Sequence, residues 1–163
     1  MNSHDRIADA LDIVNCARYF EDIKRGSVYL CPVEGSAYNH KPCRFFGMYR
    51  NKKVEAVAEI EAVVDVSKDL KAEVLWENSG QSESQLQKTA IEKARRFRPQ
   101  ELPLRVFILT NITPTDFEKD TKGGMYGSKQ YFDVSPLKAK DAKDLAAKLE
   151  GRQWSEFKFY SWK

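Results

Sequence analysis

Residues 54–66 read VEAVAEIEAVVDV, and this stretch decides the fold that the sequence predicts. Every even position is apolar, and four odd positions carry a carboxylate: Glu55, Glu59, Glu61 and Asp65. A period of two is typical of a long strand with one face on a core and the other in water. Because the buried face is mostly Ala and Val, we expect a bulky element, such as a helix, to pack closely against it. The stretch is therefore predicted to be the central strand of a curved sheet or small barrel.

The length and composition of the chain are those of an ordinary globular protein. It has 163 residues, of which 42 % are hydrophobic and 31 % are charged. A chain of this size can bury a core of its own, so we expect a single α+β domain over residues 1–163. No apolar run approaches the ~18 residues that suggest a membrane span, and the N-terminal residues lack the apolar segment of a secretory signal. We therefore expect a cytoplasmic protein with no membrane partner.

Strands and helices are predicted on both sides of the central stretch. Runs rich in aromatic and β-branched residues predict shorter strands over residues 27–33, 44–50, 72–77, 104–110 and 131–135. Helices are expected over residues 3–24, from Ser82 to the residue before Pro99, and from Ser135 onward, each with a serine as N-cap. Residues 111–130 are predicted to be mostly loop, and the aromatic tail to be a last strand. Since antiparallel hairpins dominate, the predicted fold class is α+β, with a small mixed, mainly antiparallel β-barrel flanked by helices.

Positive charge is concentrated in two segments of a chain whose net charge is only +3. Residues 38–53 hold five basic residues and no acidic one, and residues 88–98 hold five basic residues against Glu92 alone. These segments carry +5 and +4, so the rest of the chain carries −6. Such an asymmetry indicates a basic face for a polyanion. The side chains expected to hold phosphates are Lys41, Arg44, Arg50, Lys52, Lys53, Arg95 and Arg96.

Aromatic side chains accompany the first basic segment. Five of them fall on the strands predicted to flank the central one: Tyr29, Phe45, Phe46, Tyr49 and Trp76. An aromatic ring offers a stacking surface to a base, and a nearby cation can hold the phosphate of the same nucleotide. We therefore expect Tyr29, Tyr49 and Trp76 to stack bases. The alternative is that these rings simply fill the core.

Signatures of catalysis are missing from the sequence. It contains no GxSxG, P-loop, GxGxxG or HExxH motif. Its two histidines are His4, close to the N-terminus, and His40, isolated in a predicted loop. The four carboxylates of the central stretch are simpler to explain as solvated partners of nearby Lys and Arg than as ligands of a divalent ion. No catalytic residue, metal ligand or cofactor is therefore predicted.

Two segments carry a family resemblance. Ile23–Gly26 reads as a helix end that leads into Val28–Leu30, and Ala56–Ile60 follows as a strand of small residues. This order, over roughly Tyr19 to Val66, resembles the PUA-like superfamily, especially its EVE and ASCH branches. The resemblance implies a small mixed barrel that binds RNA or DNA, with an aromatic-walled pocket of the kind implicated in reading modified bases. The pocket candidates that it supports are Tyr29, Tyr49 and Trp76. The insertion EGSAYNHKPCRF departs from the family pattern, so no further pocket residue is assigned.

The expected function is that of a nucleic-acid-binding module, for DNA or RNA, that reads a modified or flipped-out base in an aromatic pocket. We expect a binding protein rather than an enzyme, with a larger protein assembly as a further partner. The first alternative is a metal-dependent nuclease or nuclease-associated domain that uses Glu59, Glu61, Asp69 or Glu73. The second alternative is a domain that binds a protein or a small ligand.

Overall fold

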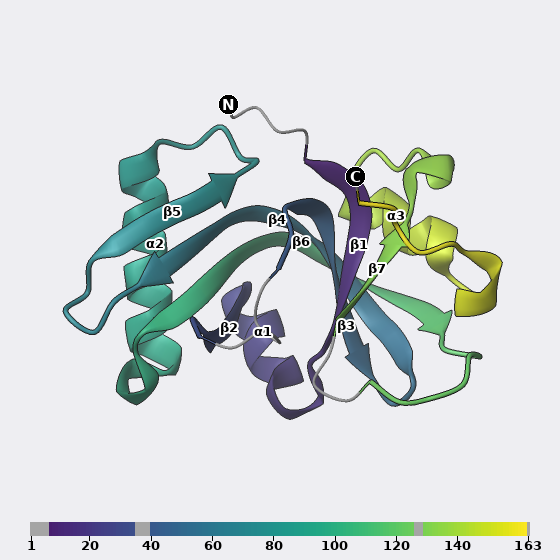
Figure 1. The fold of residues 1–163 in the computed structure, drawn as a ribbon, viewed down its shortest axis with the longest axis horizontal. Coiled ribbons are helices and arrows are strands. Elements are labelled where there is room, and N and C mark those ends of the chain that lie inside the picture. Colours follow the sequence, from purple (N-terminus) through teal and green to yellow (C-terminus); the bar gives the residue numbers. More distant parts are fainter. Residues whose placement is uncertain (1–6, 35–39, 126–128, 163) are drawn as a thin grey trace.

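The computed structural model describes residues 7–34, 40–125 and 129–162 of the chain. Within these ranges the helices are α1 (Phe20–Gly26), α2 (Glu83–Phe97) and α3 (Ala142–Leu149). The strands are β1 (Ala8–Asn15), β2 (Val28–Pro32), β3 (Cys43–Arg50), β4 (Lys53–Val66), β5 (Ala72–Glu77), β6 (Leu104–Glu118), β7 (Lys129–Asp133) and β8 (Arg152–Gln153). Figure 1 shows a curved sheet in which β4 and β6 arch over α1. The α+β class predicted from the sequence is therefore confirmed.

The described strands form one mainly antiparallel sheet that is open. Its order is β2-β6-β4-β3-β1-β7, while β5 pairs with β4 and β8 pairs with β6 beside this path. The long strand β4 changes its partner halfway, from β3 to β5, so the strands fan out into two halves. Within the described ranges no pairing joins β2 to β7, the two ends of this order. The barrel closure that the sequence predicts is not seen there.

The two faces of the sheet bury different sets of side chains. We call the face that carries α1 the inner face, and the face that carries α2 and α3 the outer face. The inner face holds one hydrophobic cluster, to which α1 contributes Phe20 and Ile23. On the outer face, α2 covers the half that contains β2 and β5, and α3 covers the half that contains β1 and β7 (Figure 1). Strands β4 and β6 run through both halves and join them.

Strand β4 is the long strand that the alternating stretch predicts, but its even positions do not share one face. Ala56, Ala58 and Ile60 lie in the inner-face cluster, whereas Ala62 and Val64 lie on the outer face, in the cluster of α2. The register of β4 against β6 shifts between Ile60 and Ala62. An irregularity of one residue exchanges the faces of all the residues that follow. The prediction of a single buried face is therefore wrong, because β4 is covered on both sides.

The N-terminal segment forms a strand where the sequence predicts a helix over residues 3–24. Strand β1 is followed by a 3-10 turn over Ala17–Tyr19 and by α1, which has 7 residues. β1 lies between β3 and β7, and it buries Leu11 on the outer face and Val14 on the inner face. A strand buried on both faces has no alternation, so its apolar run resembles a helical stripe. Ser3, the predicted N-cap, lies outside the described residues.

The predicted hairpin into the long strand and the predicted helix from Ser82 are confirmed by the β3–β4 hairpin and by α2. Asn51 and Lys52 join the two strands with φ angles of 57° and 63°, which are the left-handed values of a type I′ turn. The hydroxyl of Ser82 accepts a hydrogen bond from the backbone N–H of Gln85 at 3.1 Å and so caps α2. The helix ends before Pro99, as the sequence predicts.

Strand β6 is longer than its apolar run suggests. It continues through residues 111–118, where the sequence predicts a loop, because it pairs with β4 as far as Lys53. Helix α3 begins at Ala142 with Asp141 as its N-cap, whereas Ser135 opens a separate 3-10 turn. Long-range pairing and a competing cap therefore override two local signals.

The aromatic tail does not form the predicted strand. Within the described residues it pairs with β7 at one bridge, Phe132–Phe159, and it contains a 3-10 turn over Trp154–Glu156.

None of the described helices is long and apolar enough to span a membrane.

Candidate nucleic-acid interface

Arg50, in the first basic segment, is held by its neighbours. Its Nε and Nη2 atoms donate hydrogen bonds to the carboxylate of Glu55 at 3.0 and 2.8 Å, and its guanidinium lies 3.7 Å from the ring centroid of Phe20. Burial acts to raise the pKa of Glu55, but hydrogen bonds from Arg50 and Asn51 outweigh it, so this pKa lies below its usual value. Arg50 therefore fastens the β3–β4 hairpin to α1.

The other cations of this segment point in different directions. Arg44 donates to the carbonyl oxygen of Ala139 at 2.8 Å and also to that of Lys140. Lys53 lies 3.7 Å from Asp116, and Lys52 is exposed in the hairpin turn. Arg44 contacts the residues before α3, and Lys53 contacts β6. The side chains therefore do not form the single basic face expected from the sequence.

Lys41 lies in another aromatic cluster. Its Nζ atom is 5.0 Å from the ring centroid of Trp162, and that indole meets Tyr131 and Tyr160 at centroid distances of 5.2 and 4.5 Å. Its backbone N–H donates to the hydroxyl of Tyr131 at 2.9 Å. Lys41 therefore has a different role from the hairpin cations, since it fastens the residues before β3 to β7 and to the C-terminal tail.

The three rings predicted to stack bases do not come together. Tyr49 is 8 % exposed and packs on the outer face, 5.7 Å from Trp154. Tyr29 and Trp76 both lie on the inner face, in one row across the sheet in which Phe107 and Val63 separate them. Only Tyr29 among the three lines a pocket that is described below.

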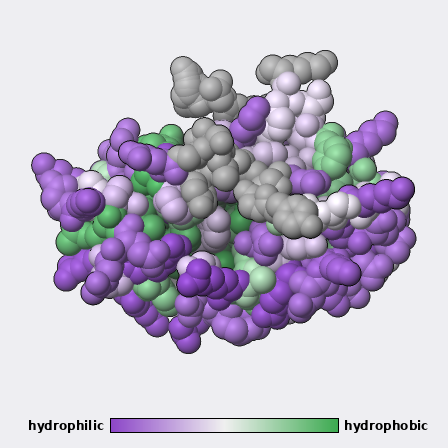
Figure 2. Space-filling model, turned by 60° about the horizontal axis from the view of Figure 1, so that its bottom comes forward, coloured by the Kyte–Doolittle hydropathy of each residue, from purple (hydrophilic) through white to green (hydrophobic). Residues whose placement is uncertain are grey.

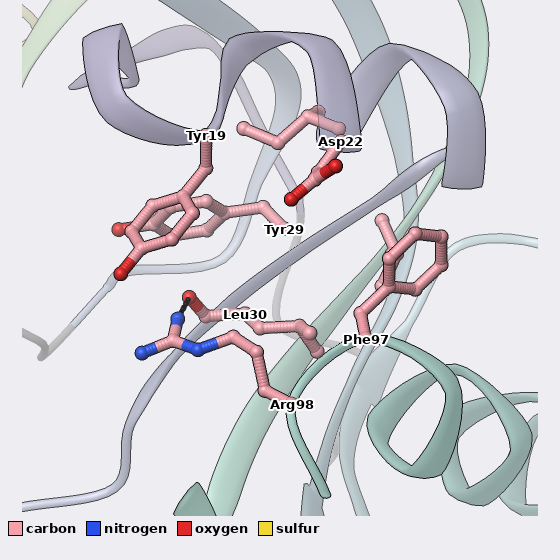
Figure 3. Close-up of a pocket in the computed structure, with 8 residues that line it drawn as sticks. Tyr19, Asp22, Tyr29, Leu30, Phe97 and Arg98 are labelled. Atoms are coloured by element: carbon pink, nitrogen blue, oxygen red, sulfur yellow. Dashed lines mark hydrogen bonds between the residues drawn. The ribbon is translucent and has the colours of Figure 1, made fainter.

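That pocket lies between α1, β2 and the end of α2. Figure 3 shows Tyr19 and Tyr29 on one side and Arg98 on the other, while Asp22 and Phe97 close the remaining walls. Its volume of about 20 Å³ is room for roughly one water molecule. We call this site the Tyr19 pocket.

The close approach of α1 and α2 that builds the Tyr19 pocket depends on Gly26. A Cβ atom at this position would lie 2.5 Å from the ring of Phe97. A side chain at this position would force the ring of Phe97 to move, so glycine permits the end of α2 to pack directly against the end of α1. Figure 2 shows the side of the molecule that carries α1, where hydrophobic patches lie among hydrophilic side chains.

Three guanidinium groups lie over the aromatic rings of Tyr19 and Phe97, which wall the Tyr19 pocket. Those of Arg18 and Arg98 lie 5.3 and 4.9 Å from the ring centroid of Tyr19, and that of Arg96 lies 4.9 Å from the ring of Phe97. These distances are within the range of cation–π attraction. Aromatic rings and cations therefore come together here, at a place that the sequence did not predict as one site.

The three arginines differ in their partners. Arg98 donates to the carbonyl oxygen of Leu30 at 2.7 Å and to Glu101 at 2.9 Å, and these bonds to Glu101 raise the pKa of Arg98 and lower that of Glu101. Arg18 and Arg96 are exposed and form no salt bridge with another described residue. Arg98 thus holds the pocket together, whereas Arg18 and Arg96 remain able to bind an anion.

A buried carboxylate and imidazole pair lies on the inner face. Nδ1 of His40 is 2.6 Å from Oδ2 of Asp12, and the two side chains are 2 % and 0 % exposed. The His40 ring also meets the rings of Phe107 and Tyr29, at centroid distances of 4.7 and 6.3 Å. Because so little of His40 is exposed, the pair cannot reach a substrate in this form. It holds the residues before β3 onto the inner face instead.

Buried polar groups gather around Asp12. Its Oδ1 atom has no hydrogen-bond partner within the described part of the chain, and Tyr131 is its cross-strand neighbour in β7. Burial, and then the charge of Asp12, raise the pKa of Tyr131. Burial likewise raises the pKa of Cys31 to about 12, and that of Cys43 as well. These thiols are therefore unreactive core residues.

The carboxylates of β4 each have a partner of their own. Glu59 accepts a hydrogen bond from Asn111 at 2.8 Å and another from the first N–H of α3 at 3.1 Å. Glu61 accepts from Gln81 at 2.6 Å, and Asp65 from Arg105 at 2.8 Å. In the ranges that the structure describes, no three His, Cys, Asp or Glu side chains are grouped so as to hold a metal ion. The geometry thus gives the nuclease alternative no support.

Sequence reasoning found part of this site and missed the rest. Tyr29 and Arg96 had been expected to contact a nucleotide, and both lie at the Tyr19 pocket or beside it. Arg18 and Tyr19 fall in the segment predicted as a helix, and Arg98 was considered only as part of the charge of the second basic segment. Their meeting depends on a contact between α1 and α2, for which the sequence offers one signal, the small residue Gly26. Comparison of the chain with protein-family models, with curated proteins and with solved structures gave no match.

Proposed function

We propose that this protein binds single-stranded nucleic acid at the Tyr19 pocket. A base stacks on the ring of Tyr19 at the rim, and the exposed guanidinium groups of Arg18 and Arg96 hold the phosphates. The observation that carries this proposal is the position of three guanidinium groups around an aromatic pocket, two of which have no salt bridge to a described residue.

The base is expected at the rim and not inside, because about 20 Å³ cannot admit it. Arg18 is exposed, so it can leave the ring of Tyr19 and make room. The exchange is favourable, since an exposed cation–π contact contributes roughly 0.5–1 kcal/mol and stacking of a base on an aromatic ring roughly 1–3 kcal/mol. The displaced guanidinium then meets the phosphate of the same nucleotide, which its planar fork can bind through two hydrogen bonds.

The finer parts of the proposal rest on the resemblance to the PUA-like superfamily. The segment that carries it, residues 19–66, comprises α1, β2, β3 and β4, and it supplies Tyr19 and Tyr29 to the pocket. On this ground we propose that the fold is related to the PUA-like superfamily. We also include a modified or flipped-out base among the ligands. DNA and RNA are both candidate partners, and a cytoplasmic location stays a prediction.

The test is the binding of a fluorescein-labelled single-stranded octamer, as DNA and as RNA, measured by fluorescence anisotropy at low salt. Tyr19→Ala should weaken binding by roughly 5- to 150-fold, as the loss of one stacked base requires, and Tyr19→Phe should retain most of it. The matched control is Phe159→Ala, which removes an exposed ring that stacks on β7. If the wild-type protein bound neither octamer, or if Tyr19→Ala bound as tightly as wild type, the proposal would be wrong.

A further inference from the structure

We infer that the bound strand continues from the Tyr19 pocket along the exposed face of α2, so that the ligand is an oligonucleotide and not a mononucleotide. This inference rests on the proposed function. It concerns five residues of α2 that line a shallow depression on its surface: Lys88, Ile91, Glu92, Arg95 and Arg96.

The helical period explains why these side chains point outward together. α2 buries Leu86, Ala90 and Ala94 against the outer face of the sheet. Residues three and four positions apart share a helix face, so Lys88, Ile91 and Arg95 line up on a different side from these buried residues. One side of α2 is thus held by the core, and the other is left to solvent.

The depression is linked to the Tyr19 pocket by one contact, that of Arg96 with Phe97. Arg96 lines it and also lies over the ring of Phe97, and Phe97 is a wall of the pocket. Arg96 and Lys88 are eight residue steps apart, which is about 12 Å along the helix axis. In duplex geometry one strand places a phosphate about every 3.4 Å along its axis. An extended single strand spaces its phosphates more widely than this, so the face of α2 has room for at most roughly three phosphates beyond the base at Tyr19.

The net positive charge of this face suits a polyanion. Three cations face one carboxylate, that of Glu92, and among the described residues neither Lys88 nor Arg95 forms a salt bridge. The half-buried Ile91 offers an apolar floor between the cations, which can receive a sugar or the edge of a base. A free mononucleotide at Tyr19 would leave Lys88 without a partner, whereas a longer strand reaches it.

The experiment compares a dinucleotide with an octamer of the same base over a range of salt concentrations. For the octamer, the double variant Lys88→Gln/Arg95→Gln should make the negative slope of log K against log salt shallower by about 1.4, or about 0.7 for each of two phosphates. Its binding of the dinucleotide should match that of wild type. The matched control is Lys140→Gln/Lys143→Gln, which makes the same charge change at exposed positions beside and on α3 and should leave both ligands unaffected.

The outcomes separate this inference from the proposed function. If wild type binds the dinucleotide and the octamer with equal affinity and equal slope, and Tyr19→Ala weakens both, the proposed function stands and the extension along α2 is wrong. An octamer slope that is unchanged in Lys88→Gln/Arg95→Gln, or lowered equally by the α3 control, also overturns the extension. If wild type binds neither ligand, both proposals are wrong.

Discussion

The two basic segments of the chain have nearly the same charge and different fates in the fold. In residues 38–53 the arginines are taken up by the protein itself: Arg50 by Glu55, and Arg44 by the carbonyl oxygens before α3. In residues 88–98, within the described part of the chain, Arg98 is the one cation whose side chain donates hydrogen bonds to the protein. A cluster of cations in a sequence therefore does not by itself indicate a surface for a polyanion.

The difference follows from the elements on which the cations lie. A hairpin such as β3–β4 brings its two strands into register, so a cation on one strand meets carboxylates that alternate along the other. A surface helix has no such facing strand. Its apolar stripe turns toward the core, and its cations stay in solvent. We therefore assign a structural role to the first segment and a binding role to the second.

The largest effect that tests this comparison is expected at His40, which belongs to the first segment. His40→Ala removes the partner of Asp12 and leaves a carboxylate that is 0 % exposed without compensation. Leaving a buried polar group without its hydrogen-bond partner costs about 1–3 kcal/mol, and more where that group is charged. Urea denaturation should show this loss, and Asp12→Asn/His40→Ala should be less destabilised than the single variant, because it leaves no unpaired charge. A loss below about 1 kcal/mol would contradict the structural role.

A smaller loss of stability is expected at Arg50. Arg50→Gln removes two charge-assisted hydrogen bonds to the half-buried Glu55 and should cost roughly 1.5–3 kcal/mol. Because the pKa of Glu55 is lowered in the folded state, this stability is present above the unfolded pKa of about 4.3 and is lost as the pH falls through the folded value. Unfolding measured from pH 7 down to pH 3 should thus show wild type and Arg50→Gln converging at acidic pH. A difference that stayed constant would show that the ion pair is not its cause.

In the second segment the expected pattern is reversed. Arg95→Gln/Arg96→Gln should change the free energy of unfolding by no more than about 0.5 kcal/mol, as is usual for exposed positions. The same variant should weaken octamer binding clearly. Thermal melting and anisotropy on one preparation would decide between the roles, and a destabilised variant with normal binding would reverse our assignment.

The smallest effect concerns the thiols. Cys43 belongs to the first segment and is fully buried. Cys16 and Cys31 are almost fully buried. Burial raises the pKa of each, and the thiolate is the reactive species. A thiol reagent at pH 8 should label the folded protein very slowly and the urea-unfolded protein at three sites. Rapid labelling of the native protein would show that the inner face is open.

Local patterns predicted the parts of the fold that local interactions build. The strand over residues 53–66, its hairpin and the capped helix α2 follow from alternation, turn and cap residues. The strand β1 could not be predicted in this way, because its pairing depends on β3 and β7 and the cover of its outer face on α3, all of which come later in the chain. The same holds for the phase change in β4 near Ile60, since a register shift is set by the partner strand.

The candidate site divides in the same manner. Tyr29 and the arginines of α2 were found because stacking and charge are properties of residue type. Tyr19 was missed because its surroundings are set by the contact of Gly26 with Phe97, residues 71 positions apart. The Asp12–His40 pair, 28 positions apart, was missed because an isolated histidine gives no sign of the carboxylate that it will meet.

The most direct test of the central claim is a matched pair of charge changes in octamer binding at low salt. Arg18→Gln/Arg96→Gln removes two cations beside the Tyr19 pocket, and Lys52→Gln/Lys53→Gln removes two from the β3–β4 hairpin. We predict that the first weakens binding roughly tenfold or more, since a charge-assisted hydrogen bond contributes about 1.5 kcal/mol or more, and that the second changes it little. Equal losses, or a larger loss for the hairpin variant, would contradict the account.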